Sequence, residues 1–283
     1  MKYIFLLSAG LLFFCSSPNA DEDVPDPQTQ NNNQNPPVTV ERKLVWSDEF
    51  DKPGAPDNTK WSYDLGDGCP SVCGWGNNEL EYYTDDPKNV RVENGVLIIE
   101  ALKENKGSKS FTSTRIISKG KGDWIYGRIE VKAKLPQGLG TWPAIWMLPT
   151  EWKYGGWPAS GEIDIMEHVG FDPGVVHGTL HSEKYNHTKG TQKEGKTTVP
   201  DFNTAFHVYA IEWSATKIDL FVDDKNYYSV FQDVSDGVQG WPFNEKFHLL
   251  MNIAVGGNWG GQKGVDENIW PQKMEIDYVR IYQ

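Results

Sequence analysis

Three carboxylates in one short segment are the residues of this chain best suited to chemistry. Residues 161–168 read Gly-Glu-Ile-Asp-Ile-Met-Glu-His and carry Glu162, Asp164 and Glu167. Two carboxyl groups that flank one glycosidic bond can divide its hydrolysis between them when they lie about 5–5.5 Å apart. One then acts as nucleophile and the other as general acid and later as base. The alternative is that the three acids form only the solvated face of an exposed strand.

The local structure of this segment decides whether the acids can act together. The isoleucines between them favour a strand, which places Glu162 and Asp164 on one face and the isoleucines in the core. Strict alternation would send Glu167 into the core as well, which is costly for an unpaired acid. One extra residue, a β-bulge at Ile165-Met166, returns Glu167 to the face of the other acids.

A bulged strand also predicts workable distances. Four effective strand steps separate the Cα atoms of Glu162 and Glu167 by about 13 Å. Two long side chains that lean together on a concave sheet shorten this to about 5–6 Å between the carboxyl groups, the separation of a retaining glycosidase. The charge of Asp164 between them disfavours ionisation of a neighbouring acid and helps Glu167 keep its proton.

The rest of the chain predicts strands that would carry this segment. Residues 128–135 alternate between apolar and polar side chains, residues 96–102 form a β-branched run, residues 207–222 look like two strands with a turn near 214–216, and residues 274–282 alternate again. No stretch of helical period exceeds one or two turns. Many strands with long loops indicate an all-β fold, one sandwich of two antiparallel sheets.

Composition limits the classes of function. The chain has 283 residues and a formal net charge of -12. Nucleic-acid binding needs clustered Lys and Arg, and the sequence has no such cluster, so we expect no nucleic-acid partner. The 12 Trp residues fit either a large aromatic core or platforms that stack on the apolar faces of sugar rings.

The N-terminal segment predicts export. Residues 1–15 resemble a lipoprotein-type signal peptide, with a short apolar run that ends just before Cys15. We expect a lipid anchor on Cys15, and ordinary cleavage near Ala20 is the alternative. Residues 16–42, rich in Asn, Gln, Pro and Asp, are predicted to be a flexible linker, and residues 43–283 the globular domain. The protein is then an exported outer-membrane lipoprotein, at the cell surface or facing the periplasm.

Cys69 and Cys73 lie in the loop segment Cys-Pro-Ser-Val-Cys. Export permits a disulfide between them, which we favour. A metal site is disfavoured because no second Cys or His pair lies nearby in the sequence, and two free thiols are the remaining alternative.

Several motifs together resemble glycoside hydrolase family 16, in its laminarinase-like branch. The form of the acidic motif with an extra residue before the last glutamate resembles that branch. The other matching segments are residues 44–50, 77–84, 141–148, 252–259 and 276–280, and the match covers residues 43–283. The resemblance implies a β-jelly roll with a cleft across its concave face, retention of anomeric configuration and no cofactor in the chemistry. It implies Glu162 as nucleophile, Asp164 as its assisting acid and Glu167 as acid/base.

The resemblance also implies residues that bind the sugar. Trp142 and Trp146 share a face of a strand and would shape the subsites beside the cut, with core packing as the alternative. Trp157 would stack on a sugar or cover the edge of the core. Asn77 and Glu79 would hydrogen-bond sugar hydroxyls on the nonreducing side, with turn capping as the alternative.

Three basic residues complete the predicted site. Arg115 would bind a sugar, pair with a catalytic carboxylate or form a structural salt bridge. His177 and His181 point the same way on a strand, but a zinc pair is disfavoured because a third ligand is not evident. We expect His181 to be a polar cleft residue near the acid/base, and His177 is equally consistent with a satisfied core histidine.

A structural calcium ion on the convex side is a further expectation from the resemblance. Its ligands would be Glu49, the backbone carbonyl of Gly95 and Asp277, since carboxylate and carbonyl oxygens suit calcium. The alternative is that these acids are only solvated.

The function that these features predict is an endo-β-1,3-glucanase, with mixed-linkage β-1,3-1,4-glucan as a candidate second substrate. An endoglucanase specific for mixed-linkage glucan is the nearest alternative. Agarases and carrageenases share the bulged motif, but a cleft for sulfated galactan would carry more Arg and Lys. A non-catalytic glucan-binding lipoprotein would have lost at least one carboxylate, and a structural lipoprotein would need none of them. A monomer is expected.

Overall fold

The computed structural model describes residues 42–283. The predicted signal peptide, Cys15 with its lipid anchor, and all but the last residue of the predicted linker lie outside the described residues. Within residues 42–283, no helix is both long enough and apolar enough to cross a bilayer.

Two eight-stranded antiparallel sheets make up most of the domain. The first, which we call the outer sheet, contains β16 (Lys225–Phe231), β15 (Lys217–Val222), β14 (His207–Trp213), β9 (Gly127–Lys134), β18 (Gln272–Tyr282), β5 (Val96–Ala101) and β4 (Val90–Glu93), with β1 (Leu44–Asp48) paired to β18. The second, which we call the cleft sheet, contains β13 (Lys193–Thr198), β12 (Val175–His181), β11 (Glu162–His168), β10 (Thr141–Pro149), β17 (Phe247–Val255), β7 (Arg115–Ile117) and β2 (Ser62–Tyr63), with β8 (Asp123–Trp124) paired to β17.

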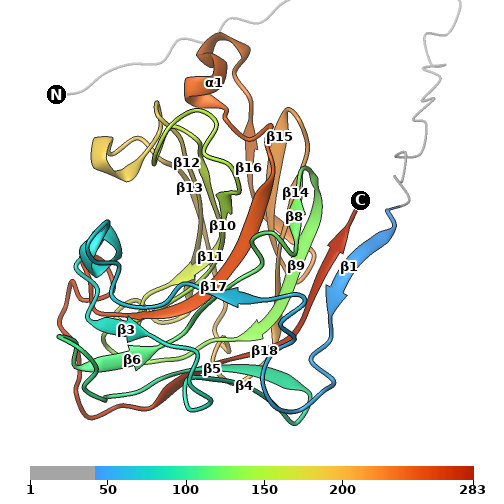
Figure 1. Ribbon diagram of the computed structural model, residues 1–283. Helices are drawn as coiled ribbons and strands as arrows, with labels where there is room; N and C mark the ends of the chain where they lie inside the picture. The colour runs from blue at the N-terminus through green and yellow to red at the C-terminus, as the bar shows by residue number, and fades with distance from the viewer. Residues whose placement is uncertain (1–41) are drawn as a thin grey trace, which may run out of the picture. The chain divides into compact units, whose positions relative to one another are not determined.

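The two sheets stack face to face and curve in the same direction, with the cleft sheet on the concave side (Figure 1). This confirms the predicted all-β jelly-roll sandwich. The predicted strands are also present. Residues 128–135 fall almost entirely in β9, residues 96–102 in β5 and residues 274–282 in β18, and the turn near 214–216 separates β14 from β15.

Apolar side chains between the two sheets form the hydrophobic core. Ile163, Ile165 and Met166 of β11 are completely buried, as are Ile129 of β9 and Ile211 of β14. Burial of one such side chain contributes about 1.5–3 kcal/mol. The core therefore holds β11 from behind and leaves its other face to the concave side of the molecule.

The remaining elements are short. A small parallel pair consists of β3 (Glu81–Tyr83) and β6 (Phe111–Ser113). The helical elements are η1 (Cys73–Gly76), η2 (His187–Lys189), η3 (Val234–Asp236) and α1 (Gly237–Gly240). Residues of η1 and η2 reach the rim of the concave face, where they help to enclose a cleft.

Candidate active site

The strand β11 carries the three carboxylates and contains the predicted β-bulge. In the pairing with β10, Ile165 has no partner, because Asp164 and Met166 face consecutive residues of that strand. The pairing with β12 shows the same extra residue between Asp164 and Glu167. Ile165 and Met166 are both completely buried, whereas Glu162 and Glu167 line the cleft. Two successive side chains thus enter the core, and the acids share one face.

Two indole N–H groups hold the glutamates in place. Trp157, in the loop before β11, donates from Nε1 to Glu162 Oε2 at 2.8 Å. Trp142, on β10, donates from Nε1 to Glu167 Oε1 at 3.0 Å. Neither glutamate forms an ion pair with a Lys or Arg of residues 42–283. The carboxylates are therefore oriented by neutral donors that leave their charge uncompensated.

Asp164 lies between the two glutamates and shares His181 with one of them. His181 Nε2 lies 3.4 Å from Asp164 Oδ2 and 3.8 Å from Glu162 Oε1. His181, expected to be a polar cleft residue near the acid/base Glu167, does not line the cleft, and the register of β12 places it opposite Glu162, with His177 opposite Glu167. Within the described part of the chain, Glu162, Asp164 and His181 are also the one group of acids and histidines close enough to share a metal ion, with ligand atoms within 4.8 Å of one another.

Burial and mutual repulsion keep protons on the three acids. Burial raises the pKa of Glu162 to about 8, and the charge of Asp164 adds to this effect. Burial also raises the pKa of Asp164 to about 8. The pKa of Glu167 lies well above its ordinary value, first through burial and then through Asp164. His181, Trp157 and the charge of Arg115 favour the charged form of Glu162, and Trp142 and His181 favour that of Glu167.

A cleft of about 450 Å³ lies over the acids. Indole rings form much of its wall: Trp75, Trp142, Trp146, Trp152 and Trp157. Its polar lining comes from Asn77, Glu79, Arg115, Glu162, Asp164, Glu167, His187, Thr188 and Asn252. A concave site with flat aromatic walls and a few convergent polar groups suits a sugar chain, which has apolar ring faces and hydroxyl edges.

The predicted aromatic residues all face this cleft rather than the core. Trp142 packs edge to face on Trp259, with ring centroids 5.5 Å apart. Trp146 donates from Nε1 to Asn252 Oδ1 at 2.8 Å. Trp157 is 37% exposed, so its ring retains free surface beyond the hydrogen bond to Glu162. A single strand, β10, thus contributes two of the three predicted indoles.

Asn77 and Glu79 lie together and both line the cleft. Asn77 Nδ2 donates to Glu79 Oε1 at 3.3 Å, and Tyr83 OH donates to Glu79 Oε2 at 3.3 Å. The completely buried Glu81 lies beside this pair and accepts from the Val255 amide at 2.6 Å. Burial raises the pKa of Glu79 and, together with the charge of Glu79, holds the pKa of Glu81 well above its ordinary value.

Arg115 and His177 have structural partners. Asp64 Oδ2 lies 3.3 Å from Arg115 Nε, so the expected salt bridge is made with Asp64 and not with a catalytic carboxylate, although Arg115 also lines the cleft. His177 Nδ1 lies 2.6 Å from Glu194 Oε1, and His177 is buried. His177 does not line the cleft, which agrees with the alternative of a core histidine.

Several cleft residues were not predicted individually, among them Trp75, Trp152, His187 and Asn252. Trp75 comes from the short η1 and Trp152 from a loop, where no strand periodicity announces the direction of a side chain. His187 comes from η2, and its ring lies 5.0 Å from that of Trp157. Asn252 lies on β17 opposite Ala144 of β10, in a segment noted only as part of a motif. The high Trp content was the one signal in the sequence that pointed to further aromatic surface.

The expected disulfide between Cys69 and Cys73 is present, with a sulfur–sulfur distance of 2.14 Å. It closes a short loop that ends at Cys73, the first residue of η1, and η1 contributes Trp75 and Gly76 to the cleft.

Comparisons with known proteins agree on one family. The model of glycosyl hydrolases family 16 matches residues 75–280. A β-glucanase of Rhodothermus marinus is 54% identical over 248 residues, which cover 85% of this chain and 85% of that protein.

Solved structures give the same result. The laminarinase of Rhodothermus marinus is 53% identical, covers 86% of this chain and 97% of its own, and has a TM-score of 0.82. SCLam, a non-specific endo-β-1,3(4)-glucanase, is 47% identical over 86% of this chain and 92% of its own, with a TM-score of 0.81. The extent of these matches and the acid-bearing bulged strand show that the chain belongs to glycoside hydrolase family 16.

Proposed function

We propose that the protein is a retaining endo-β-1,3-glucanase that also cuts mixed-linkage β-1,3-1,4-glucan. The observation that carries this proposal is the bulge in β11, because it brings Glu162, Asp164 and Glu167 to one face of an aromatic cleft. The names of similar family members, a laminarinase and a non-specific endo-β-1,3(4)-glucanase, support the substrate class. The cleft lies across a sheet and is not a closed pocket, which favours attack within a chain.

Hydrolysis would follow a double displacement. A Glu162 oxygen attacks the anomeric carbon as the glycosidic bond breaks, and Glu167 gives its proton to the leaving oxygen. A water molecule then loses a proton to Glu167 and attacks the same carbon, which frees Glu162 and retains the anomeric configuration. Asp164, a neighbour of Glu162 on the strand, acts through its charge on the pKa of Glu162.

The charges around the two glutamates support these roles. A nucleophile must be charged while the general acid is still protonated. Burial and the charge of Asp164 raise the pKa of both glutamates, but the charge of Glu162 raises that of Glu167 further, and the charge of Arg115 favours the charged form of Glu162. Of the two glutamates, Glu167 is therefore the one suited to hold the proton.

The charge of the cleft supports a neutral substrate. Arg115 is the only Lys or Arg among the cleft-lining residues of the described chain. A sulfated galactan would need more cationic partners, so agar-type and carrageenan-type substrates are disfavoured. A non-catalytic glucan-binding role is disfavoured because all three acids are present and converge.

Product analysis on a panel of polysaccharides tests the function. We expect short oligosaccharides from laminarin and from barley β-glucan, no products from agar, and an initial product with retained configuration by NMR. Cleavage of barley β-glucan alone would favour a mixed-linkage enzyme. Release of glucose alone would contradict endo action, and no cleavage of either glucan would contradict the proposal.

We further propose that residues 1–15 direct export, that Cys15 carries a lipid and that residues 16–42 tether a monomeric domain to the outer membrane. The support is the sequence pattern alone. Cys15→Ser should move the protein from the membrane fraction to the soluble fraction. An unchanged distribution would contradict the anchor, and sedimentation of residues 43–283 tests the monomer.

The structural calcium ion implied by the resemblance fits the described side chains poorly. Glu49 accepts hydrogen bonds from Arg280 at 3.0 and 2.8 Å, and Asp277 Oδ2 lies 2.8 Å from Lys132 Nζ. A calcium ion at these carboxylates would have to displace both cations. We therefore assign no step of the reaction to it, and thermal unfolding with calcium or with a chelator would reveal any stabilising ion.

A further inference from the structure

Arg115 lies between two indole rings of the cleft. Its guanidinium carbon is 4.6 Å from the ring centroid of Trp75 and 4.6 Å from that of Trp146. A guanidinium that stacks on aromatic faces keeps its N–H groups free at the edge of the plane. Asp64 lies near Nε, and the Nη atoms have no hydrogen-bond acceptor among residues 42–283. The sandwich therefore presents unused donors beside the cleft.

The two indoles of this sandwich differ in how they are supported. Trp146 lies within β10, in the middle of the cleft sheet, and its Nε1 is bound to Asn252. Trp75 lies in η1 with φ of 51°, and its Nε1 has no partner among the described residues. A side chain on so short an element needs support from the surrounding loop to keep one position. The ring packs against that of Tyr83, with centroids 5.5 Å apart, and the backbone of η1 is held by residues 67–76, which we call the disulfide loop, where the Gly74 amide donates to Asp67 O at 2.8 Å.

The disulfide loop is closed in several ways. The Cys69–Cys73 bond joins its two arms, and the Val72 amide donates to Gly68 O at 2.7 Å. Gly68 has φ of +79°, and a Cβ there would lie 2.1 Å from Val72 O, so only glycine permits this turn. The bond thus stands directly beside η1 and Trp75.

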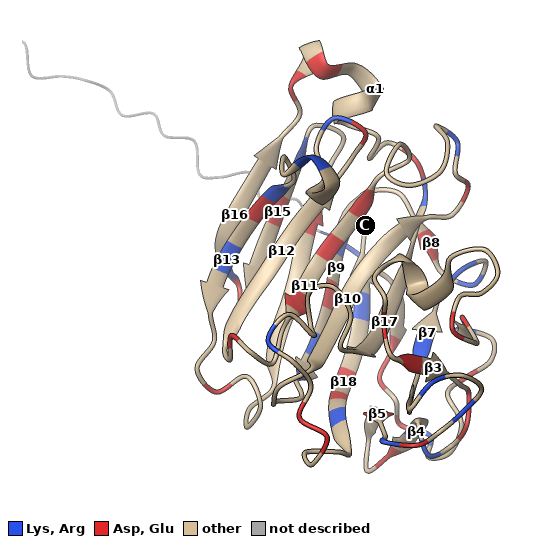
Figure 2. Ribbon diagram, turned by 90° about the vertical axis from the view of Figure 1, so that its left-hand side faces the viewer, with Lys and Arg blue, Asp and Glu red and all other residues tan. Residues whose placement is uncertain are grey.

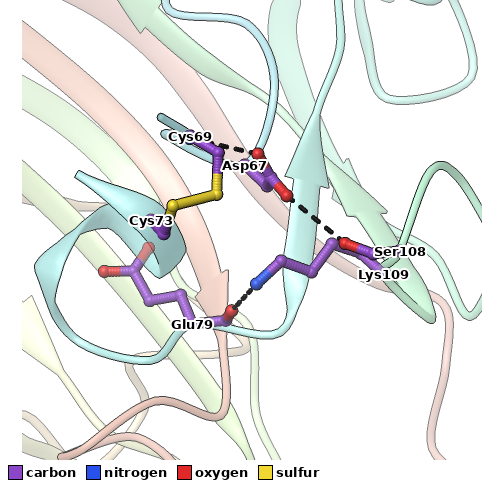
Figure 3. Close-up of a disulfide and its surroundings, with 6 residues drawn as sticks. All are labelled: Asp67, Cys69, Cys73, Glu79, Ser108 and Lys109. Atoms are coloured by element: carbon purple, nitrogen blue, oxygen red, sulfur yellow. Dashed lines mark hydrogen bonds between the residues drawn. A yellow bond between two sulfur atoms is a disulfide. The ribbon is translucent and has the colours of Figure 1, made fainter. Parts of the chain in front are cut away.

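The hairpin around Lys106–Lys109 braces the disulfide loop from outside (Figure 3). Asp67 accepts from the Cys69 amide at 3.1 Å and from Ser108 Oγ at 3.4 Å. Lys109 Nζ donates to the backbone oxygen of Glu79 at 2.5 Å, so the hairpin also contacts a residue that lines the cleft. Cys69 and Cys73 are both exposed, so a reductant can reach their bond.

We propose that the disulfide loop is a positioning device that holds Trp75 against Arg115 and so sets the affinity of the cleft for its sugar chain. Trp75 is a specificity-determining residue, and the Cys69–Cys73 bond fixes its place. The inference rests on the proposed function, because the affinity of the cleft is measured with a glucan. It predicts an effect on substrate affinity, with the chemical step at Glu162 left intact.

Reduction of the native protein is the first experiment. A phosphine reductant and one water molecule break the S–S bond: the phosphine gives two electrons, the water gives the two thiol protons and the oxygen of the phosphine oxide, and the products are two thiols and the phosphine oxide. We expect the KM for laminarin to rise about 3- to 30-fold, the equivalent of one cation–π contact, with kcat changed less than about twofold. Cys69→Ser/Cys73→Ser should show the raised KM without reductant and no further change with it. That variant controls for other effects of the phosphine.

Substitution of Trp75 is the second experiment. Trp75→Ala should raise KM as reduction does, and Trp75→Phe should recover most of the loss because a ring face remains. Phe231→Ala, which removes an aromatic side chain 67% exposed at the end of β16, is the matched control and should leave KM unchanged. Calorimetry measures the affinity of each variant for laminaritetraose in a Glu162→Gln background. Because this background does not turn over, the measurement separates affinity from turnover.

The outcomes separate this inference from the proposed function. If the native protein cleaves laminarin but neither reduction nor Trp75→Ala changes KM or the affinity for laminaritetraose, the positioning role is wrong and the function stands. A fall in kcat with unchanged affinity also contradicts it. If the native protein neither binds nor cleaves β-glucan, the proposed function itself fails. Melting temperatures show whether Trp75→Ala is folded, and reduction of the native chain supplies the same test without substitution.

Discussion

Acidic side chains of the cleft and acidic side chains of the outer sheet lie in opposite electrostatic environments. The acidic positions of β11, in the cleft sheet, are red in Figure 2. In the cleft, Glu162, Asp164 and Glu167 have raised pKa values and form no ion pair with a Lys or Arg of residues 42–283. Their nearest polar partners are indoles and a histidine.

The outer sheet shows the reverse arrangement. Glu49 is held by Arg280, whose hydrogen bonds lower its pKa. Glu212 lies 2.6 Å from Arg42, and hydrogen bonds from this arginine lower its pKa as well. Arg128 reaches the same carboxylate at 3.5 Å. These acids stay charged and are compensated by neighbouring cations.

The difference between the two sheets shows that the cost in stability falls on the cleft sheet. An acid that is buried without a cation destabilises the fold whenever it is charged. The cleft sheet retains three such groups side by side, whereas the outer sheet neutralises its acids in pairs. Uncompensated acids are what proton transfer and nucleophilic attack require, so the imbalance marks the site of chemistry.

The largest expected effect comes from removing the cleft acids. Glu167→Gln should lower kcat/KM on laminarin by about 10²- to 10⁴-fold, the usual contribution of a general acid/base, and Glu162→Gln should lower it at least as much. Neither variant should unfold at a lower temperature at about pH 8, since each loses a buried acid. Steady-state kinetics and calorimetry provide the measurements. Near-native activity of Glu162→Gln would overturn its assignment as nucleophile.

The pH dependence of stability is the second test of the comparison. A carboxyl with a pKa of about 4.5 when unfolded and about 8 in the folded state, as for Glu162, favours folding below the first value. That contribution is lost as pH rises through the second. We expect the free energy of unfolding to fall by a few kcal/mol between about pH 5.5 and 9, because a difference of one pH unit between the folded and unfolded pKa corresponds to about 1.4 kcal/mol. Denaturant melts should show a smaller fall for Glu162→Gln, and equal slopes would contradict the raised pKa.

The indole donors provide a finer test. Trp157→Phe removes a hydrogen bond that favours the charged form of Glu162, so its pKa should rise and the acidic limb of the kcat/KM profile should move to higher pH. The rate at the optimum should fall about tenfold or more, as for a hydrogen bond to a charged group worth about 1.5–3 kcal/mol. Trp142→Phe should instead move the basic limb upward through Glu167. Identical shifts in both variants would contradict separate roles for the glutamates.

The smallest effect is expected on the outer sheet. Glu212→Gln removes a surface ion pair with Arg42 and should lower stability by about 0.2–1 kcal/mol without changing kcat/KM. Because the folded pKa of Glu212 is lowered, its contribution exists above the unfolded pKa and is lost as pH falls. Melts at about pH 7 should therefore separate this variant from the native protein, and melts near pH 3 should not. A loss of activity would break the contrast between the two sheets.

Much of the fold could be predicted from the sequence, because the relevant signals are local. The alternation of apolar and polar residues at 128–135 and 274–282 predicted β9 and β18, since every second side chain of a strand points into the core. The bulge was predictable for the same reason, because a buried, unpaired Glu167 would cost more than one extra residue in the strand. The residues of the acid motif were therefore sufficient to predict that its three acids share one face of the strand.

Partners across strands were harder to predict. His181 was expected as a cleft residue near Glu167, but its position opposite Glu162 depends on the register of β12 against β11, which sequence spacing does not contain. Glu81 was not singled out, although it lies buried next to Glu79. Arg115 had three candidate partners, and Asp64 and two indoles proved to surround it.

The sequence by itself determined the sandwich, the acid-bearing strand and the residue types of the cleft, because hydrophobic periodicity and the cost of burying charge act within a few residues. Only the tertiary structure decided which side chains meet. Trp157 with Glu162, Trp142 with Glu167, and Trp75 with Arg115 are joined by strand register and loop closure. Those contacts bring together distant parts of the chain, and their energies depend on distances that no local pattern specifies.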